Sequence, residues 1–131
     1  MKKKKQVYSV ALKRCFTAHH FLIGGSWGEE NELHSHDYVV EVRLEGSKLD
    51  EYNYLVDIVK IEAHVDQLIA RFQDRTLNAL PEFGGENPSI ELFAKIFSEA
   101  IVERVKNHPL SGVIVKVCQG ETASAEYRQE L

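Results

Sequence analysis

The sequence predicts an α+β domain in which two helices cover one face of a four-stranded antiparallel sheet. Two long segments near the start alternate apolar and polar residues with a period of two, the mark of a half-buried strand. Two later segments repeat apolar residues at steps of three and four, as amphipathic helices do. An apolar run and a weaker final run close the chain. The predicted element order is therefore strand, strand, helix, helix, strand, strand.

The first two strands are predicted over residues 6–18 and from about residue 34 to residue 44. One face of the first strand is apolar and is interrupted only by Arg14. That face consists of Tyr8, Val10, Leu12, Phe16 and Ala18. The matching face of the second strand consists of Tyr38, Val40, Val42 and Leu44. Several glycines and an acidic cluster indicate a flexible loop over residues 21–33.

The helices follow, each with its own start signal. Asp57 is a good N-cap for a first helix whose apolar stripe is Ile58, Ile61, Val65, Leu68 and Phe72. The second helix begins with either Asn87, which precedes a proline, or Ser89 as its cap. Its apolar face is Leu92, Phe93, Ile96, Phe97, Ala100, Ile101 and Val105. The run 113–118 is typical of a buried strand, and 123–128 is predicted as the last strand.

Length and composition restrict the function classes. The 131 residues are expected to form one domain, 1–131, with a single site. The net charge of -4 and pI near 5.9 argue against a nucleic-acid surface, and no apolar run approaches the roughly 18 residues of a membrane span. The opening lysine run is predicted to be a solvated tail, and the protein is placed in the cytoplasm. Cys15 and Cys118 are predicted to be free, buried thiols.

Three histidines form a candidate metal site. His34 and His36 stand two apart, so on a strand both imidazoles point to the same side. His20 shares the parity of the apolar face of the first strand, which favours it over His19. Three converging imidazoles can hold Zn²⁺ with one coordination position open for substrate. The alternative is that these are ordinary strand residues, because a His-x-His pair alone is a weak signal.

Several motifs together resemble the 6-pyruvoyltetrahydropterin synthase and 6-carboxytetrahydropterin synthase family. They are Phe16-Thr17-Ala18-His19-His20, Leu33-His34-Ser35-His36, Leu55-Val56-Asp57-Ile58, Thr76-Leu77-Asn78, the segment 86–91 and Tyr127. The resemblance implies the tunnelling fold, in which sheets from several subunits close into a barrel, commonly in a homohexamer of two trimers. It also implies a zinc site formed by His20, His34 and His36, and a substrate resembling 7,8-dihydroneopterin triphosphate.

The chain departs from the family pattern at three positions. Glu30 stands where the family usually has a catalytic cysteine, as in a variant group that forms the folate precursor 6-hydroxymethyl-7,8-dihydropterin. Asp74, after Gln73, replaces the histidine of a catalytic Asp-His dyad, and it is either a base or a solvated loop acid. Gln119 occupies the position of the glutamate that grips the pterin ring. Glu121 is the alternative candidate for that role.

The first functional hypothesis is a zinc-dependent lyase that breaks a carbon–oxygen or carbon–carbon bond in the side chain of a pterin, in queuosine or folate biosynthesis. The alternative is a tunnelling-fold homo-oligomer that binds metal or a heterocycle and has lost the family reaction. A zinc hydrolase on an unrelated antiparallel barrel is the third hypothesis. The resemblance over nearly the whole chain favours the first two.

Overall fold

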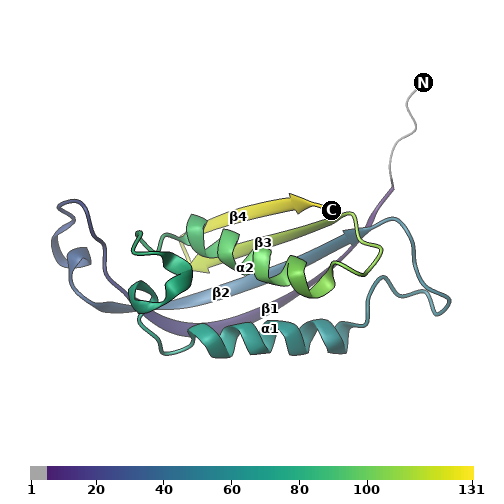
Figure 1. Ribbon diagram of the computed structural model, residues 1–131, viewed down its shortest axis with the longest axis horizontal. Coiled ribbons are helices and arrows are strands. Elements are labelled where there is room, and N and C mark those ends of the chain that lie inside the picture. The colour runs from purple at the N-terminus through teal and green to yellow at the C-terminus, as the bar shows by residue number, and fades with distance from the viewer. Residues whose placement is uncertain (1–5) are drawn as a thin grey trace, which may run out of the picture.

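The computed structural model describes residues 6–131, which form one four-stranded antiparallel sheet with two helices on one face (Figure 1). The elements are β1 (Tyr8–His20), β2 (His34–Gly46), α1 (Ile58–Phe72), α2 (Ile90–Val105), β3 (Gly112–Gln119) and β4 (Ala123–Glu130). The strands lie in the order β1-β2-β3-β4, and every pair is antiparallel. This arrangement confirms the predicted fold class.

The pairing of β1 with β2 brings the histidines to one end of the sheet. The register runs from Tyr8 opposite Gly46 to His20 opposite His34. β1 therefore continues two residues beyond the predicted end at Ala18, because the hydrogen-bonded ladder includes both His19 and His20. The loop that connects the two strands leaves and enters at this same end (Figure 1).

The core lies between the sheet and the two helices. Phe93 of α2 is fully buried, and its ring lies 5.1–5.7 Å from four other aromatic rings, those of Phe16, Tyr38, Phe72 and Phe83. Asp57 caps α1 by accepting a hydrogen bond from the amide of Val59 at 3.0 Å. Ser89 rather than Asn87 caps α2, since its hydroxyl accepts from the amide of Leu92. Asp57 was the predicted N-cap of the first helix, and Ser89 was one of the two candidates for the second.

Arg14, which interrupts the apolar face of β1, pairs with α1. Its guanidinium lies 2.6 Å from Glu62 Oε2 and 2.8 Å from Asp66 Oδ1. The two carboxylates stand four residues apart on the helix, so both face the same position on the strand. The polar residue within the apolar stripe thus has partners on the helix that covers it.

The face of the sheet opposite the helices is polar. Lys13, Glu41, Lys116 and Glu126 lie side by side across the four strands with alternating charge. Cys15 and Cys118 lie on this same face, both free, with Cys15 exposed and Cys118 half-buried. The prediction of buried thiols was wrong because it followed the general tendency of cysteine and not the strand parity.

Two sequence predictions concern the periphery of the molecule. The lysine run at residues 2–5 lies outside the described residues. Within residues 6–131, neither helix has the length and apolar stretch needed to cross a bilayer.

Candidate metal centre

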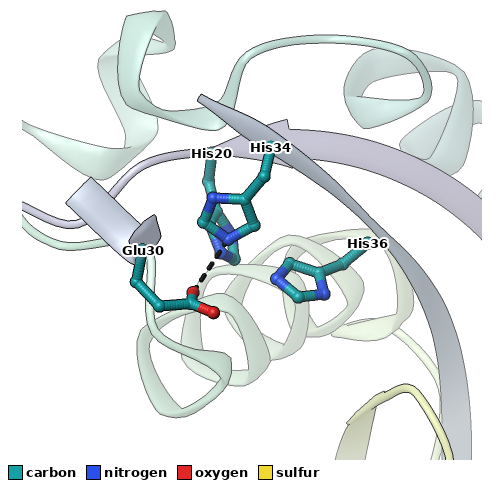
Figure 2. Close-up of side chains that lie close together, drawn as sticks. All are labelled: His20, Glu30, His34 and His36. Carbon is teal, nitrogen blue, oxygen red and sulfur yellow. Dashed lines mark ion pairs between the residues drawn. The ribbon is translucent and has the colours of Figure 1, made fainter. Parts of the chain in front are cut away.

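Three imidazoles and one carboxylate meet at the histidine end of the sheet. His20 ends β1, whereas His34 and His36 begin β2, and Glu30 belongs to a short 3₁₀ helix (Gly28–Asn31) in the connecting loop. One ligand atom from each of the four residues lies within 4.8 Å of all the others. Figure 2 shows the carboxylate of Glu30 directed at the histidine cluster from the side of the loop. As parity predicted, His20 and not His19 joins the pair.

The ring of His34 has one engaged nitrogen and one free nitrogen. Its Nδ1 donates to the backbone carbonyl of Glu32 at 2.7 Å, and because a carbonyl only accepts, Nδ1 carries a proton. When the ring is neutral, Nε2 holds a lone pair. This atom is buried without a hydrogen-bond partner, although Glu30 Oε2 lies 3.0 Å away. Two electron-rich atoms at this distance need a cation or a proton between them, so the donor set fits a bound metal ion.

His20 is held by Tyr38. The Tyr38 hydroxyl lies 2.8 Å from His20 Nδ1, and both side chains are almost fully buried. The rings of Phe16 and Phe93 pack against the Tyr38 ring at 5.4 Å each. With Nδ1 engaged, Nε2 is the nitrogen of His20 that remains for a metal.

Burial favours the neutral imidazole at His20 and at His36. Desolvation first, and then the nearby His36 and His34, lower the pKa of His20 to about 4. The pKa of His36 is lowered as well, mainly by desolvation and then by His34. Burial also raises the pKa of Tyr38, which is therefore a neutral phenol. Neutral imidazoles are the form that binds a metal ion, so no proton has to be displaced from His20 near neutral pH.

Of the other predicted site residues, Gln119 lies beside the cluster, whereas Glu121 and Asp74 lie outside the group of metal-ligating atoms. Gln119, the last residue of β3, lies beside His36, with 3.3 Å between Gln119 Nε2 and His36 Nε2. Glu121 is exposed in the turn that follows β3. Asp74 is exposed after α1 in a left-handed backbone conformation, outside the group of metal-ligating atoms. Its amide donates to the carbonyl of Thr17 in β1.

Sequence reasoning missed two contributors to this site. Tyr38 was predicted only as an apolar-face residue, although its shared parity with the histidines was a usable signal. The Glu32 carbonyl is a backbone group in a loop, and nothing in the residue pattern marks it. Both contacts fix an imidazole through Nδ1 and leave the other nitrogen directed at the centre.

Comparisons with known proteins agree on one family. Residues 9–130 match the family described as 6-pyruvoyl tetrahydropterin synthase. A search of curated protein sequences gives no match.

Solved structures with the same fold come from several organisms. The 6-pyruvoyl tetrahydropterin synthase of Caenorhabditis elegans superposes with a TM-score of 0.82 at 19% identity, covering 98% of this chain and 100% of that one. The Plasmodium vivax enzyme gives 0.81 at 14% identity, covering 96% and 99%. The Plasmodium falciparum enzyme gives 0.79 at 14% identity, covering 95% and 99%. The fold is thus the tunnelling fold that the sequence predicted.

The match to the family extends over almost the whole chain, and the fold agrees with that of solved family structures. A cluster of three histidines and a glutamate that can hold a metal ion lies at the end of the sheet where β1 and β2 meet the loop between them. These findings support a lyase-type enzyme of pterin biosynthesis. The chain belongs to the 6-pyruvoyl tetrahydropterin synthase family.

Proposed function

We propose that this protein is a zinc-dependent lyase that acts on the side chain of 7,8-dihydroneopterin triphosphate or a related pterin. The observation that carries the proposal is the buried, unpartnered Nε2 of His34, which faces a carboxylate oxygen within a cluster of imidazoles. His20, His34 and His36 are the proposed ligands. When bound, the zinc supplies Lewis-acid polarisation of side-chain oxygens and so acidifies the neighbouring C–H and O–H bonds.

Glu30 is the proposed proton carrier. Its Oε2 lies 3.0 Å from Nε2 of His34, one of the proposed ligands, and about half of the side chain is exposed. A substrate held at the centre is therefore within reach of this carboxylate. In the Plasmodium vivax synthase the catalytic residue that was mutated to alanine and to cysteine is also a glutamate. That precedent supports a catalytic role for Glu30.

The carboxylate of Glu30 suits proton abstraction better than covalent catalysis. It is a weaker nucleophile than a thiolate, but it accepts a proton readily, so abstraction of a hydroxyl or C–H proton suits it better than covalent catalysis. When a side-chain hydroxyl loses its proton, its carbon–oxygen bond becomes a carbonyl as the adjacent carbon–carbon bond breaks. The carbon that stays on the pterin takes up a proton, and the rest of the side chain leaves as an aldehyde. We therefore propose carbon–carbon cleavage, with 6-hydroxymethyl-7,8-dihydropterin as the product implied by the resemblance, ahead of carbon–oxygen elimination.

Gln119 is the proposed contact for the pterin ring. It lies next to His36, on the side of the sheet that carries the histidines. An amide accepts hydrogen bonds through its oxygen only, so it complements one ring donor where a carboxylate complements two. Glu121 and Asp74 are secondary proposals, for ring binding and for proton transfer, that require substrate or a second subunit to approach them.

Assembly into a homo-oligomer is proposed as well, with two trimers as the expected arrangement. β4 and the part of β1 that precedes Thr17 are open edges of the sheet, whereas residues 74–76 bond to Thr17 and His19. Open edges are usually covered in stable proteins. β1 and β4 run in opposite directions, so β4 of one copy can extend the sheet of the next as an antiparallel neighbour. Sedimentation at micromolar concentration should show an oligomer, and a monomer would contradict closure into a barrel.

The contact between Gln119 and His36 favours a second candidate, a binding protein of the same fold that has lost the family reaction. The amide competes for one of the proposed ligand nitrogens. Incubation of the zinc-loaded protein with dihydroneopterin triphosphate, followed by mass spectrometry, separates the two candidates. A product with a shortened or dehydrated side chain supports the lyase. Substrate that binds and is recovered unchanged supports the binding protein.

A further inference from the structure

Two asparagine side chains fix the chain immediately after His20. Asn78 accepts from the amide of Phe21 at 3.0 Å and donates to the carbonyl of the same residue at 2.9 Å. Asn87 makes the same pair of bonds with Ile23, at 2.7 Å and 2.9 Å. Each side chain therefore imitates the backbone of a neighbouring strand. We call this arrangement the asparagine clamp.

The residue between the two clamped positions is joined to Glu30. The amide of Leu22 donates to the backbone carbonyl of Glu30 at 2.9 Å. The carbonyl of Leu22 accepts from the side chain of Asn31, whose oxygen in turn accepts from the amide of Trp27. The short 3₁₀ helix that carries Glu30 is thus bound to a segment that the asparagine clamp holds on both sides.

The loop needs such support because its own backbone is permissive. Gly24 and Gly28 both have positive φ, of 77° and 64°, and glycine adopts many other conformations at little cost. None of the residues in the 3₁₀ helix is buried, so core packing does not hold Glu30 in place. Hydrogen bonds therefore determine its position, and those of the asparagine clamp are the ones that tie the loop to the rest of the molecule.

We propose that Asn78 and Asn87 are positioning residues for Glu30: through Phe21, Leu22 and Ile23 they hold its carboxylate at the histidine cluster. The proposal rests on the proposed function of Glu30 as a proton carrier. The histidines do not depend on the clamp in the same way, since they lie in the ladder between β1 and β2. Loss of the clamp should therefore lower turnover without loss of metal.

Hydrogen exchange in the metal-free protein tests the clamp without any activity. Asn87→Ala removes the acceptor of the Ile23 amide, which should exchange faster for a local reason. The Leu22 amide bonds to Glu30 and not to Asn87, so its exchange should also accelerate only if the clamp holds the loop. Unchanged protection of Leu22 would overturn the proposal. Asn107→Ala, at an exposed position after α2, is the matched control and should leave both amides unchanged.

A double-mutant cycle tests the connection to Glu30. Asn87→Ala should lower kcat by about tenfold or more with KM little changed, because small displacements of a catalytic group are costly. In a Glu30→Gln background the same change should have almost no further effect. An equal loss in both backgrounds would overturn the role of the clamp. If Glu30→Gln alone has no effect on kcat, the proposed function fails, and the exchange of Leu22 still reports whether the clamp holds the loop.

Asn87→Asp provides the conservative variant should Asn87→Ala fold poorly. It keeps an oxygen to accept from the Ile23 amide and loses the donor to the Ile23 carbonyl. We expect zinc content equal to that of the wild type and a kcat between those of the wild type and Asn87→Ala. A loss of zinc in Asn87→Asp would show that the clamp supports the histidines and not Glu30 specifically, and would also overturn the proposal.

Discussion

The three histidines lie on two strands joined by a continuous ladder, whereas Glu30 lies on a loop that contains three glycines. The ladder fixes His20, His34 and His36 through backbone hydrogen bonds, which do not depend on side chains elsewhere. The loop is fixed by side chains from segments more than 50 residues away in sequence. The proposed metal binding and the proposed proton transfer therefore depend on two different kinds of support. Substitutions that leave the ladder intact should lower turnover more than they lower metal content.

The largest expected effect comes from removing a ligand. His20→Ala should abolish zinc binding, because two imidazoles do not make a tight site. Elemental analysis of purified protein measures the metal content, which we expect to be close to one zinc per chain in the wild type. His19→Ala is the matched control, since His19 lies on the other face of the strand. Loss of metal in His19→Ala together with retention in His20→Ala would contradict the assigned ligands.

The next largest effect should come from changing Glu30 in the loop. Glu30→Gln should keep zinc and oligomer but lower turnover by about a hundredfold or more, because an amide cannot accept the proton. Steady-state kinetics with dihydroneopterin triphosphate measure the loss. Glu29→Gln and Glu32→Gln are the controls from the same acidic loop and should have much smaller effects. Small, similar effects at all three positions would mean that the loop is a solvated acidic surface.

The strands were more predictable from sequence than the loop, for a physical reason. Alternation depends only on neighbours along the chain, so it is sufficient to place His20 on the same side of the sheet as His34 and His36. Even Arg14, an exception to the pattern, did not disturb the assignment, because its partners Glu62 and Asp66 lie on the covering helix.

The support of the loop had no such local signal. Asn78 and Asn87 were recognised as parts of family motifs, but their bonds to Phe21 and Ile23 span 57 and 64 residues. The position of Glu30 beside His34 likewise depends on a loop conformation that periodicity does not describe. The family resemblance pointed to Glu30, and only the three-dimensional arrangement shows what holds it there.

Acid should lower the stability of the metal-free protein, because His20 at the end of β1 is buried. The folded-state pKa of His20 is about 4, below the ordinary value of 6.5, so the unfolded chain binds the proton more readily. Stability is therefore full above pH 6.5 and falls as the pH drops towards 4. Between pH 7 and pH 5 the free energy of unfolding should decrease by about 2 kcal/mol from His20 alone.

Urea denaturation of the metal-free protein at several pH values measures this dependence. His36 acts in the same direction, because its pKa is also lowered. His20→Phe, which cannot be protonated, is the control variant, and its stability should depend less on pH over the same range. A wild-type stability that does not fall between pH 7 and pH 5 would contradict the assigned burial of His20.

The smallest effect should come from a single buried hydroxyl. With zinc on Nε2 of His20, Nδ1 must carry the proton, and the Tyr38 oxygen 2.8 Å away accepts it. Tyr38→Phe keeps the ring between Phe16 and Phe93 but removes this acceptor, so zinc affinity should fall by about tenfold. Competition with a chromophoric chelator measures the affinity. Tyr127→Phe, at a half-buried position beside the core, removes the same atom elsewhere and should leave the affinity unchanged. Equal affinities for the wild type and Tyr38→Phe would show that the β1–β2 ladder alone orients His20. The support of the histidines by the ladder would then differ still more from the support of Glu30 by the asparagine clamp.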